Sequence, residues 1–553
     1  MNRLLSIFCF LLSRLRSRAS ARHAAFCPRR AEAQRRRVAL SFLLSAFCFS
    51  APAIAKDIYV AQTAQGSGNG TSAANAYAVT WFNTAGNWGS GGSQINPGDT
   101  VHLCGTITSA LTIQASGTAS AQTTIYFESG ANITVPYFPQ YTAGGQINGN
   151  SKSYYTIDGG GHGWITATSS YGNSGSTPAA IVPGTSGTIV GVTIQNLTVT
   201  NVYAMQNNST GDNTEATVIM AYDLLVTNFT VRGCLLGQAY SGLSLLYAGG
   251  HNYNVQIYSN TIVHCNWLTR VAPYTGASIM DTVNQYGNIG DYIGTDYDDG
   301  SDNNHHDGFF WDASASGSWT TNVHIFNNAL GPHLGIQTTA HIYFSAAGGG
   351  GHHAGLIYNN VFSIASTVSS IAPGDGCIYL WGFTGDVYNN TINDARNGSG
   401  ACIEVTTDTP ALVNVENNII TGCKACIANN IGTWDYNLYY YSGGVPSLMN
   451  NQTWSSWQSS GHDTHSIVAD PLYVNASAYN FAIQSGSPAI GATPQNFSSL
   501  FTTDIAGKGR PATGNWTMGA YLYGSGSVTP APAPPTQFQA TKVYAKTLTI
   551  NPQ

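Results

Sequence analysis

The feature of this chain that most constrains its fold is a short strand that recurs along the sequence and ends in asparagine. Six such segments lie between Val192 and Ile420, and the asparagines of the last four are separated by 32, 30 and 28 residues. Apolar and polar residues alternate within each segment, which is the two-residue period of a β-strand. A unit of this length cannot bury its apolar face alone. The repeats therefore predict a solenoid in which each coil covers the next.

The recurring asparagine has a structural explanation. Asparagine tolerates the left-handed backbone conformation of a tight corner, and it can hydrogen bond to the equivalent asparagine one coil away. We therefore interpret the repeated asparagines as a structural ladder and not as ligands; they are Asn260, Asn328, Asn360, Asn390 and Asn418.

A second series of strands precedes the asparagine strands and includes Asp307-Gly-Phe-Phe-Trp, His341-Ile-Tyr-Phe, Cys377-Ile-Tyr-Leu-Trp and Cys402-Ile-Glu-Val. We expect the isoleucines of these strands to point into the core. The residues that alternate with them then share one outer face: His341, Tyr343, Tyr379 and Glu404. Trp311 is expected on the same face, although a shift of one residue in the register of its strand would turn its side chain into the core.

The first 55 residues are predicted to be a leader and not part of the fold. Arg35 to Arg37 form a charged region, Val38 to Ile54 form an apolar region, and Ala53-Ile54-Ala55 is a cleavage motif of small residues. We expect the mature chain to begin at Lys56 and to be secreted, whether to the periplasm, the cell surface or the medium. No other segment qualifies as a membrane span.

The rest of the chain divides into segments according to whether the asparagine repeat is present. We expect an N-terminal cap and first coils over 56–150, and a parallel β-helix core over 151–430 with a loop insertion at 270–306. Closing coils follow over 431–524 and a proline-rich linker and tail over 525–553. A solenoid accommodates this length because it grows along one axis, whereas globular cores stop growing at roughly 250–300 residues.

Charge argues against two classes of partner. Of the 20 Lys and Arg, ten lie at or before Arg37, and only one of the 26 Asp and Glu does, which leaves 10 cations against 25 anions, a net charge of −15. Nucleic acid and anionic membranes are therefore disfavoured as partners. We expect a monomer that acts on an extracellular polysaccharide.

Several segments at the two ends carry a family resemblance. They are Ile58-Tyr-Val-Ala-Gln-Thr-Ala, Pro97-Gly-Asp-Thr-Val-His-Leu, Asp470-Pro-Leu-Tyr-Val-Asn, Gly486-Ser-Pro-Ala-Ile-Gly and Gly519-Ala-Tyr-Leu-Tyr. Together with the asparagine strands, they resemble secreted bacterial right-handed parallel β-helix repeat proteins of the pectate-lyase-like superfamily. The resemblance implies an all-β right-handed solenoid with irregular caps. It does not settle the chemistry, because the superfamily includes lyases, hydrolases, epimerases and adhesins.

Seven cysteines follow the leader, and the expected compartment permits disulfides. The pairs Cys234/Cys265 and Cys377/Cys402 are spaced so that each could fall on neighbouring coils. Cys423-Lys-Ala-Cys426 is a CxxC motif, but no second cysteine pair or histidine set completes a zinc site.

The segment from Arg270 to Asp312 interrupts the repeat and is dense in acids, and long loops on a rigid solenoid commonly carry function. The first interpretation is a glycoside hydrolase, which needs two carboxyl groups. Asp307 and Asp299 are the leading carboxylates, with Asp298, Asp312 and Glu404 as further candidates. His306 and His341 would transfer or orient protons. The sugar-binding residues would be Trp311, Tyr343, Tyr379 and Trp381, with Glu404 beside them.

Three alternatives remain open. In a cation-dependent polysaccharide lyase, Asp296, Asp298 and Asp302 would bind Ca²⁺ and Arg270 would serve as the base. In a transition-metal site, the ligands would be His305, His306 and His341, with His352 or His353. In a non-catalytic protein, the same face would bind glycans through its aromatic residues alone.

Overall fold

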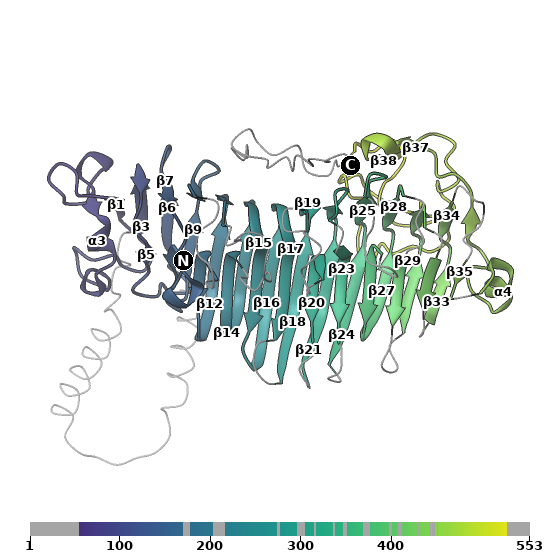
Figure 1. Cartoon of the computed structure of the whole chain (residues 1–553), viewed down its shortest axis with the longest axis horizontal. Coiled ribbons are helices and arrows are strands. Elements are labelled where there is room, and N and C mark those ends of the chain that lie inside the picture. Colours follow the sequence, from purple (N-terminus) through teal and green to yellow (C-terminus); the bar gives the residue numbers. More distant parts are fainter. Residues whose placement is uncertain are drawn as a thin grey trace, which may run out of the picture. The chain divides into compact units, whose positions relative to one another are not determined.

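The chain is wound into a right-handed parallel β-helix, in which each coil contributes one strand to each of three sheets (Figure 1). The computed structural model describes residues 55–169, 177–202, 216–273, 277–295, 305–313, 317–335, 338–346, 351–368, 376–396, 401–406, 412–423, 425–428, 431–441, 444, 448–450 and 452–527. The predicted leader before Ala55 and the predicted tail beyond Ser527 lie outside these residues. No helix in the described ranges is long and apolar enough to cross a membrane.

Sheet 1 is made of the strands that precede the asparagine corner. They are β1 (Asp57–Ala61), β2 (Tyr77–Ala78), β3 (Thr100–Cys104), β6 (Thr123–Phe127), β9 (Tyr155–Asp158), β12 (Gly187–Gln195), the second half of β14 (Thr217–Arg232), β16 (Gly250–Tyr258), β18 (Ser278–Tyr286), β21 (Trp319–Phe326), β24 (His352–Tyr358), β27 (Phe383–Tyr388), β30 (Val413–Glu416) and β33 (Ile431–Asp435).

Sheet 2 follows the corner. Its strands are β4 (Thr106–Ile107), β7 (Asn132–Val135), β10 (Trp164–Ala167), β13 (Thr198–Thr200), the first parts of β15 (Leu235–Tyr247) and β17 (Thr261–Pro273), β19 (Ile289–Ile293), β22 (Ala329–Leu330), β25 (Val361–Ile364), β28 (Thr391–Asp394), β31 (Ile419–Thr421), β34 (Leu438–Tyr440) and β36 (Ile467–Val468).

Sheet 3 completes each coil. It contains β5 (Leu111–Thr112), β8 (Ile147–Asn148), β11 (Ala179–Gly184), the first half of β14, the later parts of β15 and β17, β20 (His306–Asp312), β23 (Thr338–Ser345), β26 (Ile378–Trp381), β29 (Ala401–Thr406), β32 (Ala425–Ala428) and β35 (Leu448–Met449).

The ends of the coil stack differ from its middle. The helical turns are η1 (Ala73–Asn75), α3 (Val79–Phe82), η2 (Ala85–Asn87), η3 (Tyr141–Ala143), α4 (Trp454–Ser459) and η4 (Ala476–Ala478), and the antiparallel pair β37 (Tyr473–Asn475) and β38 (Asn480–Ile483) belongs to the C-terminal segment. This segment packs back onto the coils: Arg510 donates to the side-chain oxygen of Asn359 at 2.7 Å, and Phe501 stacks on Tyr358 at 4.7 Å.

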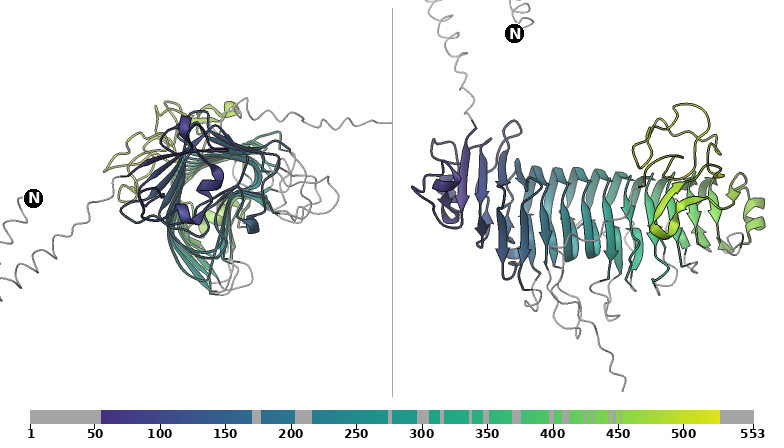
Figure 2. Two further views of the ribbon diagram at one scale, coloured as in Figure 1. Left: turned by 90° about the vertical axis from the view of Figure 1, so that its left-hand side faces the viewer. Right: turned by 90° about the horizontal axis from the view of Figure 1, so that it is seen from above.

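One continuous apolar core fills the interior of the coils, which the end-on view in Figure 2 shows surrounded by strands. Ile342, Ile378 and Ile403 are fully buried in it and pair in register across β23, β26 and β29. Their predicted inward orientation is confirmed. Each coil therefore buries its apolar face against its neighbours, as the repeat predicted.

The asparagine ladder is present and longer than expected. The Nδ2 atoms of Asn260, Asn288, Asn328, Asn360, Asn390 and Asn418 each donate to the Oδ1 atom of the next ladder asparagine, at 3.0–3.1 Å. The residue just before each ladder asparagine has a positive φ, as at Asn327 (56°) and Asn359 (60°). Left-handed backbone at this residue makes the corner, and asparagine or glycine accepts it at low cost.

The ladder ends on a carboxylate. Asn437 accepts from Asn418 and donates its Nδ2 to Asp463 Oδ1 at 3.2 Å. Asp463 is fully buried and also accepts from the Trp457 indole at 2.8 Å and the Tyr439 hydroxyl at 3.1 Å. Its oxygens therefore accept the last donors of the column.

Two sequence predictions are wrong here. The insertion expected at 270–306 is a regular coil over most of its length, since β18 and β19 lie within it and Asn288 supplies its rung of the ladder. The proposed Cys377–Cys402 pair does not form, because Cys402 is bonded to Cys423, with the two Cα atoms 5.7 Å apart. Cys234 and Cys265 are not joined to each other.

The ladder should be a main source of stability, and Asn288→Ala tests this. The Asn288 side chain donates to Ile257 O and Asn328 Oδ1 and accepts from the main-chain and side-chain nitrogens of Asn260. Each buried group left without a partner costs about 1–3 kcal/mol. We expect the variant to lower the free energy of unfolding by at least about 3 kcal/mol in urea denaturation.

Asn284→Ala is the matched control, because Asn284 lies on the same coil and, among the described residues, its side chain donates only to the half-buried Gln256. It should cost no more than about 1 kcal/mol. Equal losses in the two variants would show that the ladder contributes nothing beyond an ordinary surface contact.

Candidate functional site

A histidine–aspartate pair lies at the start of β20 on sheet 3. His305 Nδ1 lies 2.6 Å from Asp307 Oδ2, and the exposed fractions of the two side chains are 40% and 0%. The second carboxylate oxygen, Oδ1, accepts from the main-chain N–H of Ala340 at 3.2 Å. A buried carboxylate thus holds and orients an imidazole that reaches the surface.

The backbone of β20 approaches β23 closely beside this pair. A Cβ atom placed on Gly308 would lie 2.3 Å from the carbonyl oxygen of His341. Only glycine fits this contact, and its position in Asp307-Gly308 therefore explains how the carboxylate can be fully buried against the neighbouring strand.

Aromatic side chains extend from the pair along the outer face of sheet 3. Phe310, Tyr343, Tyr379 and Glu404 are in-register neighbours on β20, β23, β26 and β29. Tyr343 and Tyr379 stack at 4.6 Å, and Tyr343 lies 4.8 Å from the His305 ring. Half-buried Tyr343, Tyr379 and Glu404 occupy the face that the sequence predicted. Trp381 is half-buried and pairs with Thr406 at the end of β26.

Trp311 is not on this face. It is fully buried in the core, where it stacks on Phe344 at 5.5 Å, and Phe310 takes the outer position. The run Phe309-Phe310-Trp311 has no polar residue to fix which side faces water, so the sequence left the register undetermined. The prediction that Trp311 is a sugar platform is therefore wrong.

His341 also points inward, contrary to the prediction. The N–H groups of His341 and Ile342 both donate to the Cys377 carbonyl, so the strand does not alternate there. His341 is fully buried with Nε2 3.0 Å from the Ser363 carbonyl, and burial lowers its pKa to about 3. This neutral ring cannot exchange protons with a substrate on the outer face.

His306 is likewise fully buried, with Nε2 3.0 Å from the amide nitrogen of Asn266. The imidazole at the surface is the neighbouring His305, which the sequence offered only as a metal ligand. The signal that favoured His305 was its spacing: it lies two residues from Asp307, which places both side chains on the same side of an extended strand.

Two further residues lie near this pair. Trp267 was not among the predicted site residues, and Arg270 was predicted only as the base of a lyase. Trp267 on β17 stacks on Phe310 at 5.5 Å, and the guanidinium of Arg270 lies 4.7 Å from the Trp267 ring centre. Trp267 is 5% exposed, and its Nε1 has no hydrogen-bond partner among the described residues. Its neighbours in the sequence, Asn266 and Leu268, do not indicate which side of the strand Trp267 occupies.

Glu404 ends the row. Burial raises the pKa of its carboxyl group, and its Oε2 atom is buried with no hydrogen-bond partner within the described ranges. It cannot pair with Asp307 in hydrolysis, because three coils at ~4.8 Å place their strands ~14 Å apart. Asp312 lies five residues along β20 from Asp307, ~16 Å away in an extended strand. Both separations exceed the ~9.5 Å limit for paired catalytic carboxylates.

The remaining acids of the prediction, Asp296, Asp298, Asp299 and Asp302, lie outside the described residues, so the Ca²⁺ site stays a prediction. In the part of the chain that is described, no group of three or more His, Cys, Asp or Glu side chains is arranged to hold a metal ion. His352 and His353 lie on β24 in sheet 1, apart from His305 on sheet 3.

Comparison with known proteins identifies similar structures but no family. No protein-family model and no curated protein matches the chain. Among solved structures, the chain is similar to XylC in complex with xylose (9% identity, 85% of this chain, 99% of that chain, TM-score 0.44). It is also similar to the GH136 lacto-N-biosidase from Eubacterium ramulus, with 14% identity over 79% of this chain and 69% of that chain and a TM-score of 0.38. A third similar structure is pectate lyase Pel9A, with 12% identity over 86% of this chain and 98% of that chain and a TM-score of 0.32.

The buried carboxyl group of Glu404 should make stability depend on pH. Burial raises its folded pKa above the unfolded value, so the folded state binds this proton more tightly and loses stability as pH rises through the folded pKa. We expect Glu404→Gln to melt at a higher temperature than the parent at pH 8 and at the same temperature at pH 4. Tyr379→Phe, its in-register neighbour, should show no such difference between the two pH values; a Glu404→Gln effect equal at both would contradict the argument.

Proposed function

We propose that this protein is an extracellular carbohydrate-active enzyme that binds a polysaccharide on the outer face of sheet 3 and cleaves it beside His305. The observation that carries the proposal is the His305–Asp307 pair: a surface imidazole whose Nδ1 is held at 2.6 Å by a fully buried carboxylate. A carboxylate in this position fixes the tautomer of the ring and stabilises its protonated form. Proton exchange with substrate would then pass through Nε2.

The surroundings of the pair suit a sugar chain. Trp267 and Phe310 are buried and stack on each other beside it, and the half-buried tyrosines of β23 and β26 extend from it along the outer face. Tyrosine and tryptophan combine an apolar ring with a hydrogen-bonding group, which matches the mixed surface of a pyranose. The exposed part of the row, from His305 to Tyr379, crosses two coil steps, a length of ~10 Å that accommodates a short stretch of sugar chain.

Hydrolysis is the reaction we favour, with His305 removing a proton from the attacking water. Elimination from a uronate is the second candidate, and Arg270 favours it. Its guanidinium lies over Trp267, whose ring centre is 6.3 Å from that of His305. A cation in that place would neutralise the substrate carboxylate while the imidazole removes the adjacent proton.

Secretion is part of the proposal and rests on two observations. The sequence before Lys56 has the three regions of a signal peptide. The Cys402–Cys423 disulfide suits an oxidising compartment. The acidic mature chain, the predicted monomer and the polysaccharide partner are consistent with this location.

The first test is cleavage of neutral and acidic polysaccharides by the mature chain, with and without EDTA. New reducing ends without ultraviolet absorbance indicate hydrolysis, whereas absorbance from an unsaturated uronate indicates elimination. His305→Ala and Asp307→Asn should each lower kcat by ~10²–10⁴, the usual contribution of a positioned acid or base.

His251→Ala is the matched control, since His251 is exposed and lies 3.7 Å from Asp281 on sheet 1, away from the proposed site. It should keep full activity. An active parent whose rate is unchanged in both His305→Ala and Asp307→Asn would refute the site, and failure to cleave any polymer would refute the enzymatic function.

A further inference from the structure

A second column of outward side chains runs along sheet 1, two residues before each ladder asparagine. Its in-register members are Arg232, Tyr258, Tyr286, Phe326, Tyr358, Tyr388, Glu416 and Asp435. Successive rings stack at 4.7–4.9 Å from Tyr258 to Tyr358. In the last two coils carboxylic acids replace the rings. Like charges directly opposite each other destabilise a sheet, so stacking alone does not explain this replacement.

Glu416 lies near two other acids, Asp386 and Asp435, and its carboxyl group has no hydrogen-bond partner among the described residues. Glu416 is 7% exposed. Burial raises its pKa first, and the charges of Asp386 and Asp435 raise it further, to about 7. Glu416 therefore keeps its proton to higher pH than an ordinary glutamate, and it faces the side chains of two other acids.

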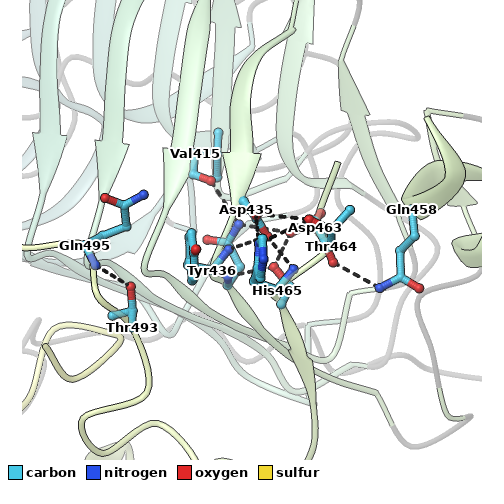
Figure 3. Close-up of polar contacts among 11 residues, drawn as sticks. Val415, Asp435, Tyr436, Gln458, Asp463, Thr464, His465, Thr493 and Gln495 are labelled. Carbon is cyan, nitrogen blue, oxygen red and sulfur yellow. Dashed lines mark hydrogen bonds and ion pairs between the residues drawn. The ribbon is translucent and has the colours of Figure 1, made fainter. Parts of the chain in front are cut away.

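Asp435 has the opposite surroundings. Its oxygens accept from the main-chain N–H groups of Tyr436 (2.9 Å) and His465 (2.8 Å), and Oδ2 lies 2.7 Å from His465 Nδ1 (Figure 3). These contacts hold the Asp435 carboxyl group in one orientation. The His465 side chain is 61% exposed, so this edge of the pair is open to solvent.

We propose that Glu416 and Asp435 form a second acid–base site, which cleaves a glycosidic bond with retention of configuration. In-register neighbours on adjacent coils are ~4.8 Å apart. That spacing is close to the ~5–5.5 Å between the carboxyl groups of retaining glycosidases. Burial and the neighbouring acids favour the protonated form of Glu416, which suits the proton donor, and the hydrogen bonds that orient Asp435 suit the nucleophile. The site is on sheet 1 and does not depend on the His305–Asp307 pair.

The chemistry balances with water as the only co-reactant. Glu416 donates its proton to the glycosidic oxygen while an Asp435 oxygen attacks the anomeric carbon, so the C–O bond breaks and the alcohol leaves. The Glu416 carboxylate then removes a proton from water, whose oxygen displaces Asp435 from the anomeric carbon. Both side chains return to their starting forms, and one glycoside and one water have become two hydroxyl compounds.

The C-terminal segment closes one side of this site. Phe497 stacks on Tyr388 at 4.0 Å, and the Asn417 amide donates to the Gln495 carbonyl at 3.2 Å. The sugar must therefore enter from the side of His465, and His465 serves as a positioning residue that holds Asp435 in place.

The test compares Glu416→Gln and Asp435→Asn in the mature chain on a panel of aryl glycosides. On substrates with poor leaving groups, both changes should lower kcat at least ~100-fold, which is the usual rate contribution of one catalytic acid or base. With a dinitrophenyl leaving group, which needs no proton, Glu416→Gln should recover activity and Asp435→Asn should not. Azide should rescue Asp435→Gly and yield a glycosyl azide.

Glu128→Gln, the same change at a half-exposed carboxylate that contacts His102, is the control and should keep parental rates. The proposal is overturned if the parent hydrolyses no glycoside, or if both site variants keep rates within twofold of it while their melting temperatures are unchanged. Activity lost only in His305→Ala would overturn this inference and leave the proposed function standing.

Discussion

Every position in this molecule depends on keeping neighbouring coils in register, and the buried asparagine ladder enforces that register. Each ladder asparagine accepts both the main-chain and the side-chain nitrogen of the asparagine one coil earlier, as Asn360 does from Asn328. A slip of one residue would break both bonds and turn the apolar face of the strand outward. Because the corners are fixed in this way, side chains at equivalent positions form straight columns ~4.8 Å apart.

This stacking limits what an aromatic column can do. In-register rings cover each other's faces, as Tyr343 and Tyr379 do at an interplanar angle of 10° and Tyr286 and Phe326 at 3°. Such columns present ring edges and hydroxyl groups to solvent, while the contacts between ring faces stabilise the stack. The candidate sites lie where a column is interrupted: His305 is tilted by 33° to Tyr343, and Glu416 replaces the next ring after Tyr388.

The fold could be predicted because its signal repeats, whereas each feature of the sites occurs once. The asparagine segments fixed the corners and the inward isoleucines, although the coil of Asn288 was missed. Trp311 could not be placed from an all-aromatic run, and the irregular bonding of His341 to Cys377 has no sequence signal. Glu416 was visible two residues before Asn418, but only alignment of the coils shows that rings occupy its column elsewhere.

The ladder also has a direction. Each ladder amide donates one hydrogen to a main-chain carbonyl of the preceding coil and the other to the next ladder side chain, and the last of these donors finishes on the Asp463 carboxylate. An asparagine there would bring two further hydrogens into a fully buried place. Whole coils inserted ahead of Asn437 would leave this end unchanged, whereas a ladder continued past Asp463 would have to replace the carboxylate with another amide. The carboxylate at this end therefore marks where the ladder stops, while the number of coils before it is not fixed by this contact.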